Sequence, residues 1–418
     1  MRPSQHSQQS SGSSSRSVSE PENSHLPKGS VWQVFITFLR LGLTSFGGPV
    51  AHIGYFRTEL VEKQCWLSDS QFAQLLAICQ FLPGPASSQM GFSLGLMRAG
   101  WGGAFAAFLA FTAPSVALMM LFAYCLPYFS GETGAAVIHG LKIVALAVVA
   151  QGVLGMARQL CPDNTRAGMA LLATATVLIV GTASAQLVLV VIGVVAGIWL
   201  CKDIKPEPAA ALTVPCGVPL GMVCLMVFVL LFIGLPLMSG AGGILAVMQG
   251  FYQAGALVFG GGHVVLPMLE DAVVTTGWIS PEDFLAGYGA AQALPGPMFS
   301  FAAYLGSVLP EGMGGVGGAL LAVLSIFLPG FLLLAGCLPL WQKVSQGTFA
   351  ARGIAGVNAV VVGLLGAALF DPVFVSAVTE PADLAIGIVG FLMLVIWRLS
   401  PLWVVGWCVA ASLTLALA

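Results

Sequence analysis

Long apolar runs separated by short polar connections make up most of this sequence. Thirteen such segments can be delimited, at 31–55, 72–97, 102–129, 137–158, 168–184, 186–201, 217–238, 245–269, 284–309, 314–340, 353–371, 384–399 and 401–418. A helix needs about 20 apolar residues to cross a bilayer, and most of these runs approach or exceed that length. The pattern predicts an all-α integral membrane protein.

The first thirty residues differ from the rest. They contain eleven Ser together with several Gln and Pro, and no apolar core. Such a segment cannot bury enough apolar surface to fold, so residues 1–30 are expected to form a disordered, Ser-rich cytoplasmic tail. Nothing in it resembles a cleaved signal peptide.

Composition narrows the class of protein. Hydrophobic residues make up 58% of the 418 residues and charged residues only 8%, with a mean hydropathy of +0.95. The 15 basic and 17 acidic residues give a net charge of −2, which offers no basic field for nucleic acid. The nine cysteines form no CxxC and no Cys/His cluster, so no metal and no cofactor is expected. The chain also lacks GxxxxGK[ST], which argues against ATP hydrolysis.

The two halves share motifs at a nearly constant spacing. An offset of 212 places Gln80-Phe-Leu-Pro-Gly-Pro85 on Gln292-Ala-Leu-Pro-Gly-Pro297 and Trp66 on Trp278, and an offset of 213 places Phe46-Gly-Gly on Phe259-Gly-Gly. The pattern predicts two homologous repeats. We expect an N-terminal repeat at 31–201, a cytoplasmic linker at 202–216, a linking transmembrane helix at 217–238 and a C-terminal repeat at 239–418.

Charges in equivalent loops indicate that the repeats are inverted. Loop 56–71 carries Arg57 and Lys63, whereas its partner 270–283 carries acidic residues and no basic ones. Because Lys and Arg collect on the cytoplasmic side, equivalent loops are expected on opposite sides. The charges fit best with nine crossings and four re-entrant hairpins formed by the motif segments. The alternative is thirteen full crossings.

Two motifs per half interrupt the apolar segments. In Thr44-Ser-Phe-Gly-Gly-Pro49 and Leu82-Pro-Gly-Pro-Ala-Ser-Ser-Gln89, Gly and Pro stop a helix, and a new half-helix is expected to start after Pro49 and after Pro85. Irregular backbone at membrane depth requires surrounding protein or a watery cavity. The alternative is that Gly and Pro only kink packed helices.

The ends of such half-helices favour anions. Each helix N-terminus carries about +0.5 charge and free N–H donors, so four of them, after Pro49, Pro85, Gly262 and Pro297, sum to roughly +2. That charge matches an oxyanion dianion. Arg40, within an apolar run and one turn before Thr44, is a candidate ligand, although it could instead extend to the cytoplasmic surface. His52, His263 and Glu59 are candidates for carrying a coupling proton.

The stretches Arg40 to Arg57, Cys79 to Gln89 and Phe259-Gly-Gly-Gly-His263 resemble the long, two-domain form of the chromate ion transporter family. The resemblance implies a multi-pass carrier of the bacterial inner membrane that expels chromate, a sulfate analogue, and so confers resistance, driven by the proton motive force or by anion exchange. It also implies functional roles for Phe46, Gly47, Gly48, Pro49, Pro83, Gly84, Pro85, Gly260, Gly261, Pro295, Gly296 and Pro297.

These observations lead to one hypothesis. The protein is a secondary transporter that binds a tetrahedral dianion between half-helix ends and moves it across the membrane by alternating access. The expected ligands are Arg40 and the hydroxyls of Thr44, Ser45, Ser87 and Ser88, with Gln80, Gln89, Gln292 and Ser300 nearby. The expected partners are chromate or sulfate, a coupling ion and the lipid bilayer, and a homodimer is left open. The alternatives are a carrier that takes up sulfate or another oxyanion, a membrane-embedded chromate reductase and an anion channel.

Overall fold

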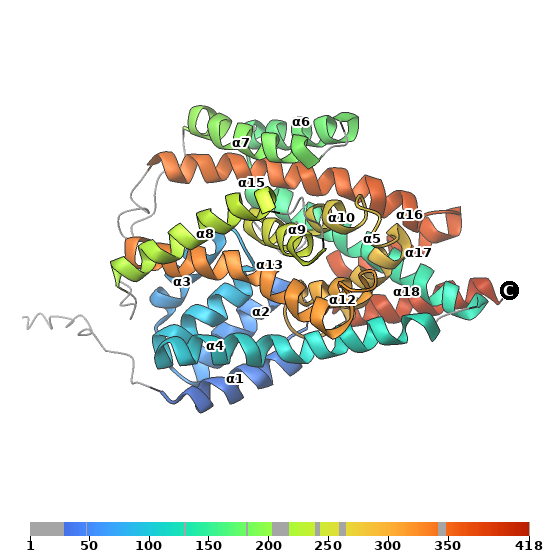
Figure 1. The fold of residues 1–418 in the computed structure, drawn as a ribbon. Coiled ribbons are helices and arrows are strands. Elements are labelled where there is room, and N and C mark those ends of the chain that lie inside the picture. The colour runs from blue at the N-terminus through green and yellow to red at the C-terminus, as the bar shows by residue number, and fades with distance from the viewer. Residues whose placement is uncertain are drawn as a thin grey trace, which may run out of the picture.

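A computed structural model describes residues 29–46, 48–128, 131–180, 183–202, 217–238, 243–258, 265–341 and 348–417. Every regular element in these ranges is helical, which confirms the predicted all-α class (Figure 1). The first half contains α1 (Val31–Thr44), α2 (Gly48–Phe56), η1 (Arg57–Lys63), α3 (Asp69–Phe81), α4 (Ala86–Cys125), η2 (Leu126–Tyr128), α5 (Glu132–Leu160), α6 (Asn164–Val180) and α7 (Ala183–Leu200).

The second half starts with a long apolar helix and repeats the same kinds of element. It contains α8 (Val218–Met238), α9 (Gly243–Leu257), α10 (Val265–Val273), α11 (Pro281–Ala293), η5 (Met298–Ser300), α12 (Phe301–Val308), α13 (Gly315–Cys337), η6 (Leu338–Leu340), α15 (Thr348–Ala368), η7 (Leu369–Phe374), α16 (Val375–Ala377), α17 (Pro381–Val395) and α18 (Pro401–Ala416).

The exterior of the molecule is suited to lipid. Five helical stretches are long and apolar enough to cross a membrane, namely Ala86–Tyr128, Glu132–Leu160, Val218–Met238, Gly315–Leu340 and Ala351–Ala377, and several shorter apolar helices accompany them. Large apolar side chains are exposed on the outer helices, as with Ile179 on α6 and Leu237 on α8. Water would penalise such a surface, whereas a bilayer solvates it. The chain is an integral membrane protein, as its composition predicts.

Helix breaks occur at the predicted motifs of the first half. Helix α1 ends at Thr44 and α2 begins at Gly48, whose φ of 76° is open to glycine and unfavourable for other residues. Helix α3 ends at Phe81, and α4 begins at Ala86 with Pro85 as its N-cap. The prolines of this second break have no N–H with which to continue a helix. Both predicted half-helix starts are therefore confirmed.

The second half is broken at the corresponding places. Helix α9 ends at Leu257 and α10 begins at Val265, and α11 ends at Ala293 before η5 begins at Met298. Between the last two, Gly296 has a φ of 96°. Among the described residues, four helices are thus interrupted at the predicted motifs, two in each half.

The interrupted helix α1–α2 doubles back on itself. The guanidinium of Arg98 lies 5.1 Å from the ring centre of Trp66, beyond the end of η1. Arg98 also contacts the start of α1, because its carbonyl accepts a hydrogen bond of 3.0 Å from the N–H of Gly29. The two ends of this unit therefore lie near the same residue. In the second half, Trp278 and Ala246 line one cavity, which brings the two ends of α9–α10 together in the same way.

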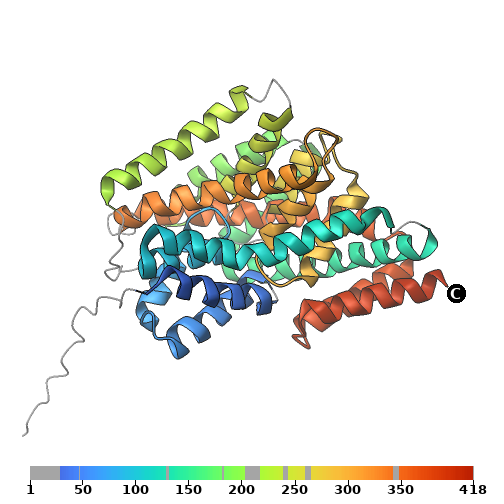
Figure 2. The same cartoon turned by 60° about the horizontal axis from the view of Figure 1, so that its bottom comes forward.

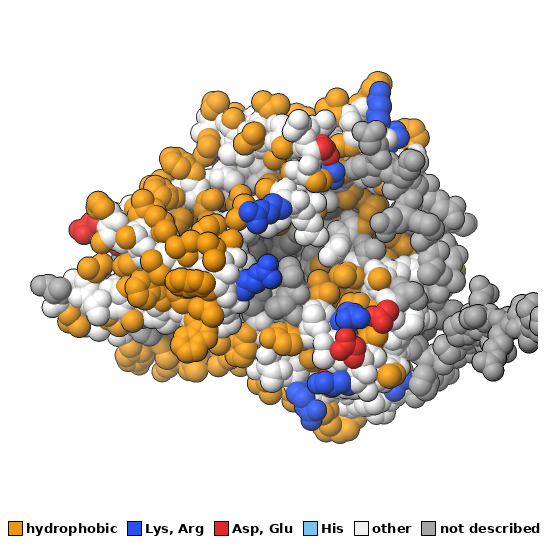
Figure 3. All heavy atoms as spheres, turned by 180° about the vertical axis from the view of Figure 1, so that it is seen from behind, with side chains coloured by type: hydrophobic (Ala, Val, Ile, Leu, Met, Phe, Trp, Pro, Cys, Tyr) orange, Lys and Arg blue, Asp and Glu red, His pale blue; other side chains and the backbone are white. Residues whose placement is uncertain are grey.

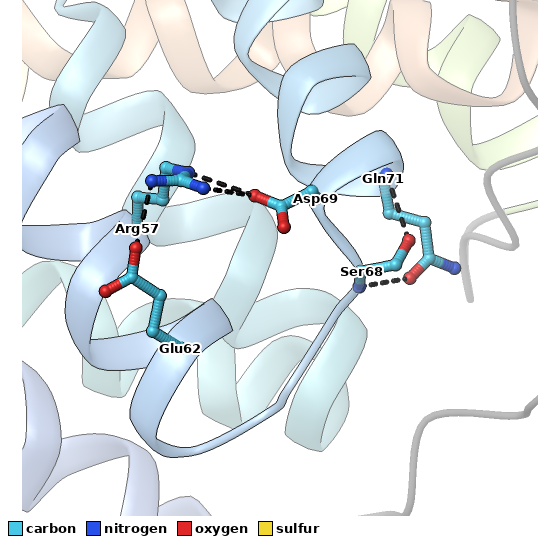
Figure 4. A network of polar contacts seen from close by, with 5 residues as sticks. All are labelled: Arg57, Glu62, Ser68, Asp69 and Gln71. Carbon is cyan, nitrogen blue, oxygen red and sulfur yellow. Dashed lines mark hydrogen bonds and ion pairs between the residues drawn. The ribbon is translucent and has the colours of Figure 1, made fainter.

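The turn after α2 is held by a polar network (Figure 4). Arg57 forms ion pairs of 2.9 Å with both Glu62 and Asp69, and so joins η1 to the first residue of α3. Ser68 and Gln71 form a capping box at the start of α3, each side chain bonding the backbone N–H of the other. The guanidinium of Arg57 is therefore occupied by two carboxylates of this turn.

Terminal helices of each half pack on the other half. Helices α6 and α7 cover α15, as the upper part of Figure 1 shows, and α17 and α18 pack against α5. Figure 2 shows α17 and α18 lying together near the C-terminus. Glycines permit close contact at these interfaces, since a Cβ at Gly197 would lie 2.4 Å from the carbonyl oxygen of Arg352. The predicted repeats are therefore interlocked in space.

Candidate functional site

Two backbone hydrogen bonds join the breaks of one half to those of the other. The N–H of Gly84 donates to the carbonyl of Val258 over 2.7 Å, and the N–H of Gly296 donates to the carbonyl of Ser45 over 2.9 Å. The donors are 212 residues apart and the acceptors 213, so the pair is reciprocal. The bonds join the four breaks in two pairs, and His52, which contacts both Ser45 and Ser87, connects one pair to the other. We call residues 45, 46, 48, 82–85, 258 and 294–297, with the helical turns that follow them, the junction.

The two donor glycines cannot be replaced without strain. Gly84 has a φ of 123°, and a Cβ there would lie 2.8 Å from Nε2 of Gln89 and 3.0 Å from Cα of Gly330. Gly296 has a φ of 96°, and a Cβ there would lie 2.8 Å from Oγ of Ser115. Left-handed backbone and close packing explain why glycine occupies both positions.

His52, on α2, connects two breaks of the first half. Its Nε2 lies 3.2 Å from the carbonyl oxygen of Ser45, and its Nδ1 lies 3.4 Å from Oγ of Ser87 on α4. A carbonyl only accepts, so Nε2 carries the hydrogen, and in the neutral ring Nδ1 accepts from the Ser87 hydroxyl. The imidazole is fully buried and meets the ring of Phe111 edge to face at 5.4 Å. His52 therefore braces the junction.

Several polar atoms at the junction are buried without a partner in the described structure. They are Oγ of Ser45, Oγ of Ser88 and Oε1 of Gln89, and all three side chains are at most 3% exposed. A buried polar atom left unpaired costs about 1–3 kcal/mol, so proteins normally pair such atoms or give them a ligand or water. The amide nitrogen of Gln89 is occupied, since it donates to the carbonyls of Pro83 and Gly330. The two hydroxyls remain available as donors.

The start of α4 adds backbone donors. Pro85 caps this helix without a side-chain hydrogen bond, and Ala86, Ser87 and Ser88 form the first turn, whose N–H groups have no partner within the helix. In the second half the equivalent start is the short 3-10 turn η5, with Pro297 as its N-cap and Ser300 buried. The two halves therefore present different donors at equivalent positions.

Other predicted site residues lie in varied surroundings. Arg40 and Thr44 are exposed on α1, and the Thr44 hydroxyl donates to the Arg40 carbonyl over 2.8 Å. Gln80 is exposed, whereas Gln292 is buried and donates to Sδ of Met298. Pro49 is the second residue of α2, Phe46 is half-buried, and Pro295 and Pro297 are buried at the junction. Gly47, Gly260, Gly261, Gly262 and His263 lie outside the described residues.

Hydrogen bonds around Glu59 favour its charged form. Gln64 and Lys63 donate to its carboxylate over 2.9 and 3.0 Å. These bonds, that from Gln64 first, hold the pKa of Glu59 below its ordinary value, and the positive charges of Lys63 and Arg40 act in the same direction. A carboxylate that stays ionised at neutral pH is poorly suited to carry a proton. This environment therefore disfavours Glu59 as the group that carries a coupling proton.

One feature near the junction was missed by the sequence reasoning. A cavity of about 500 Å³ is lined by Phe46 and Tyr55 from the first broken helix, Arg158 from α5 and Arg398 from the loop before α18. The sequence shows both arginines near segment ends, but 240 residues separate them and no local pattern indicates that they meet. Only the packing of α17 and α18 on α5 brings them to one cavity.

This fold, with broken helices meeting inside an apolar exterior, defines a multi-pass membrane protein of the kind found among secondary transporters. The chain belongs to the chromate transporter family, which matches it twice, over residues 32–199 and 245–413. The two matches cover equivalent parts of the two halves.

Several relatives are similar over most of their length. The chain is 28% identical over 383 residues to the chromate transport protein of Pseudomonas aeruginosa, covering 89% of both chains. It is 27% identical to the probable chromate transport protein of Synechococcus elongatus, covering 82% of this chain and 84% of that protein. The chromate transport protein of Cupriavidus metallidurans is 26% identical, with 82% of each chain covered. No solved structure matches this chain.

Proposed function

We propose that this protein is a secondary transporter that exports chromate from the bacterial cytoplasm across the inner membrane and thereby confers chromate resistance. Membership of the family and the names of the three relatives support chromate as the substrate. The observation that carries the proposal is the junction, where four interrupted helices meet around buried hydroxyls that have no partner in the described structure. A tetrahedral oxyanion fits those donors.

The proposed binding site lies at the start of α4. The hydroxyls of Ser45 and Ser88 donate to the oxyanion, and the first-turn N–H groups of α4 and α2 contribute positive partial charge. The Ser87 hydroxyl is shared with His52. Arg40 supplies a formal charge five residues before Ser45 on the exposed face of α1. Rigid rocking of one repeat against the other would expose the site to each side in turn.

One contact between loops supports the proposed re-entrant topology, and two others agree equally with thirteen crossings. Residues expected on the same side of the membrane lie together: Arg352 donates to the carbonyl of Lys202 over 2.8 Å, and His139 lies 2.8 Å from Asp383. Glu270 is close enough to Asp371 for their charges to interact. Asp371 is outside in either scheme, so this proximity favours two hairpins over two crossings for α9–α12. We propose nine crossings, four hairpins and inverted repeats on this basis.

Transport by inside-out membrane vesicles tests this function. Vesicles from cells that produce the protein should accumulate labelled chromate faster than vesicles without it, and an imposed proton gradient or a trapped counter-anion should increase the rate. Sulfate should compete, since the two dianions share shape and charge.

Each rival makes a different prediction in the same assay. A reductase changes the oxidation state of chromium, whereas a carrier leaves it unchanged. A channel gives flux that neither a proton gradient nor a counter-anion stimulates. An uptake carrier for sulfate fills right-side-out vesicles in preference to inverted ones. Any of these results would contradict chromate export.

A further inference from the structure

The cavity lined by Arg158 and Arg398 contains two cations that lack protein partners. In the described part of the chain neither guanidinium forms an ion pair or a hydrogen bond. Three other arginines are engaged: Arg57 pairs with two carboxylates, Arg166 with Asp163, and Arg352 with a backbone carbonyl. Both side chains are exposed, so solvent screens their mutual repulsion, and both guanidiniums keep their donors available for an anion in the cleft.

The other walls of the cavity suit an anion as well. Ser400, the N-cap residue of α18, lines it and makes no side-chain capping bond, so the first turn of this 16-residue helix faces the cleft with its positive end. Gln151 adds an amide. No carboxylate is among the residues that line it. Figure 3, a view from behind, shows a hollow with Lys and Arg side chains along its edge.

The cavity ends next to the junction. Phe46 lines it, and the preceding residue, Ser45, is fully buried at the junction with an unpartnered hydroxyl. Tyr55, on α2, lines the cavity one helical turn beyond His52. The cavity that contains the two arginines therefore extends to the residue that follows Ser45 of the proposed binding site.

A cavity of the second half has a different lining. The cavity beside α9 and α10, about 210 Å³ in volume, is lined by Gln253 and Asp271. Gln253 lies 213 residues after Arg40, at the equivalent position. Asp271 gives this second cavity a carboxyl group, whereas no carboxylate lines the cavity of Arg158 and Arg398.

We infer that Arg158 and Arg398 form a capture site for a tetrahedral oxyanion dianion, chromate or sulfate, which is loaded there before it reaches the junction. This inference rests on the proposed transport function and adds a second, peripheral binding site to it. The planar fork of each guanidinium binds two oxyanion oxygens at once, and the summed charge of +2 matches the ligand. The site lies on the side of Arg158, the proposed cytoplasmic side, as export requires.

Binding and transport by arginine variants test the inference. The variants are Arg158→Gln, Arg398→Asn and the double variant. Asn suits position 398 because Arg398 has a φ of 51°, a left-handed conformation that Asn tolerates. Arg166→Gln is the control, since it removes an arginine that pairs with Asp163 and does not line the cavity.

Equilibrium dialysis of the purified full chain against labelled sulfate and chromate should show Kd raised by roughly tenfold or more in each single variant. In vesicles the KM should rise while the maximal rate at saturating substrate changes little, because the junction is intact. Arg158→Lys should restore part of the affinity, since it keeps the charge and loses the fork. The control should match the wild type.

A measurement on the wild-type protein tests the inference even if the variants fail to fold. Sulfate should slow modification of Arg158 and Arg398 by an arginine-selective dicarbonyl reagent, followed by peptide mass spectrometry, and should not protect Arg166. Wild-type Kd and KM in a folded double variant, or equal modification with and without sulfate, would overturn the capture site. A wild-type protein that transports no oxyanion at all would instead overturn the proposed function.

Discussion

At the scale of single residues, removing the unpartnered hydroxyls of Ser45 and Ser88 should affect transport and folding stability differently. Neither makes a hydrogen bond in the described structure, so Ser45→Ala and Ser88→Ala remove no bond and relieve a desolvation penalty. We expect the free energy of unfolding to stay constant or rise by about 1 kcal/mol, while chromate transport falls roughly tenfold because a donor to the oxyanion is lost. Thermal unfolding in detergent and vesicle transport measure the two effects.

Thr176→Ala is the matched control for these serines. The Thr176 hydroxyl lies exposed on α6 and donates to the carbonyl of Leu172 over 2.8 Å, far along the chain from the junction. It should change neither quantity appreciably. Transport at the wild-type rate in both serine variants would remove the hydroxyls from the binding site.

The bonds of His52 predict a positioning role rather than proton transfer. Both ring nitrogens have partners, Ser45 and Ser87, and full burial disfavours the charged imidazolium. His52→Gln should therefore lower transport by a similar factor, about tenfold, at every pH between 6 and 8, because the brace is lost without removing a titrating group. Initial rates across that pH range, measured at a fixed proton gradient, provide the test. A pH profile that flattens in the variant would show that His52 carries the proton.

Sequence reasoning located the helix breaks of the first half from local chemistry, whereas the binding roles of their residues stay predictions. Gly84, Pro85 and Ser88 lie at the junction because Gly and Pro follow one another closely in this motif and end the helix, whereas isolated prolines such as Pro114 and Pro329 lie inside helices. Arg158 and Arg398 were missed because their common cavity depends on helices from opposite ends of the chain. A lone arginine near a segment end gives no sign of its partner.

At the scale of elements, the breaks depend on two glycines in left-handed conformation. Ala at Gly84 or Gly296 would place a Cβ within 2.8 Å of a neighbouring side-chain atom and would hold alanine at positive φ. Each substitution should destabilise the protein by about 1–3 kcal/mol and reduce transport, because the reciprocal hydrogen bonds must shift. Unfolding temperature and transport rate should fall together.

Gly406→Ala separates this strain from a general effect of adding a methyl group. Gly406 lies within α18, and a Cβ there meets no atom within 4 Å. Alanine should be neutral or stabilise the helix by about 0.5–1 kcal/mol. If Gly84→Ala and Gly296→Ala were as stable and active as Gly406→Ala, the close packing described at the junction would be contradicted.

Element boundaries followed closely from the apolar pattern. The predicted gap between 97 and 102 corresponds to Ala99 and Gly100, where non-helical angles divide α4 into two helices. The sequence could not show that Gly95 and Gly103 on either side of this turn come into backbone contact, since that depends on how the two helices pack. Local signals thus placed the ends of the helices, and packing decided their neighbours.

At the scale of the whole molecule, the exchange of helices between the halves makes them one unit. Helix α15 packs under α6 and α7, and α5 packs against α17 and α18, so each half completes the core of the other. The self-alignment predicted two repeats. It could not predict that the terminal helices of each repeat pack on the other repeat, because an apolar helix surface can pack against many different helices. The cavity lined by Arg158 and Arg398 forms where α5 of the first half meets the segment between α17 and α18 of the second half.

The side of the membrane on which loops 56–71 and 270–283 lie distinguishes four re-entrant hairpins from thirteen crossings. Cys65 is exposed in the loop after η1, and Thr275 is exposed in the loop after α10. In a chain otherwise without cysteine, Cys65 should react with a membrane-impermeant maleimide only after the cells are permeabilised. A cysteine introduced by Thr275→Cys should react in intact spheroplasts.

The pattern of labelling identifies each alternative. Arg98 contacts both Trp66 and Gly29, and Trp278 shares a cavity with Ala246, which favours the proposed hairpins, in which each loop lies on the side where its unit begins. The reverse pattern, with Cys65 outside and Thr275→Cys inside, is what thirteen crossings require, and it would contradict those contacts. Labelling of both loops from the same side would mean that the repeats are parallel, and the charge difference between the two loops would then have another origin.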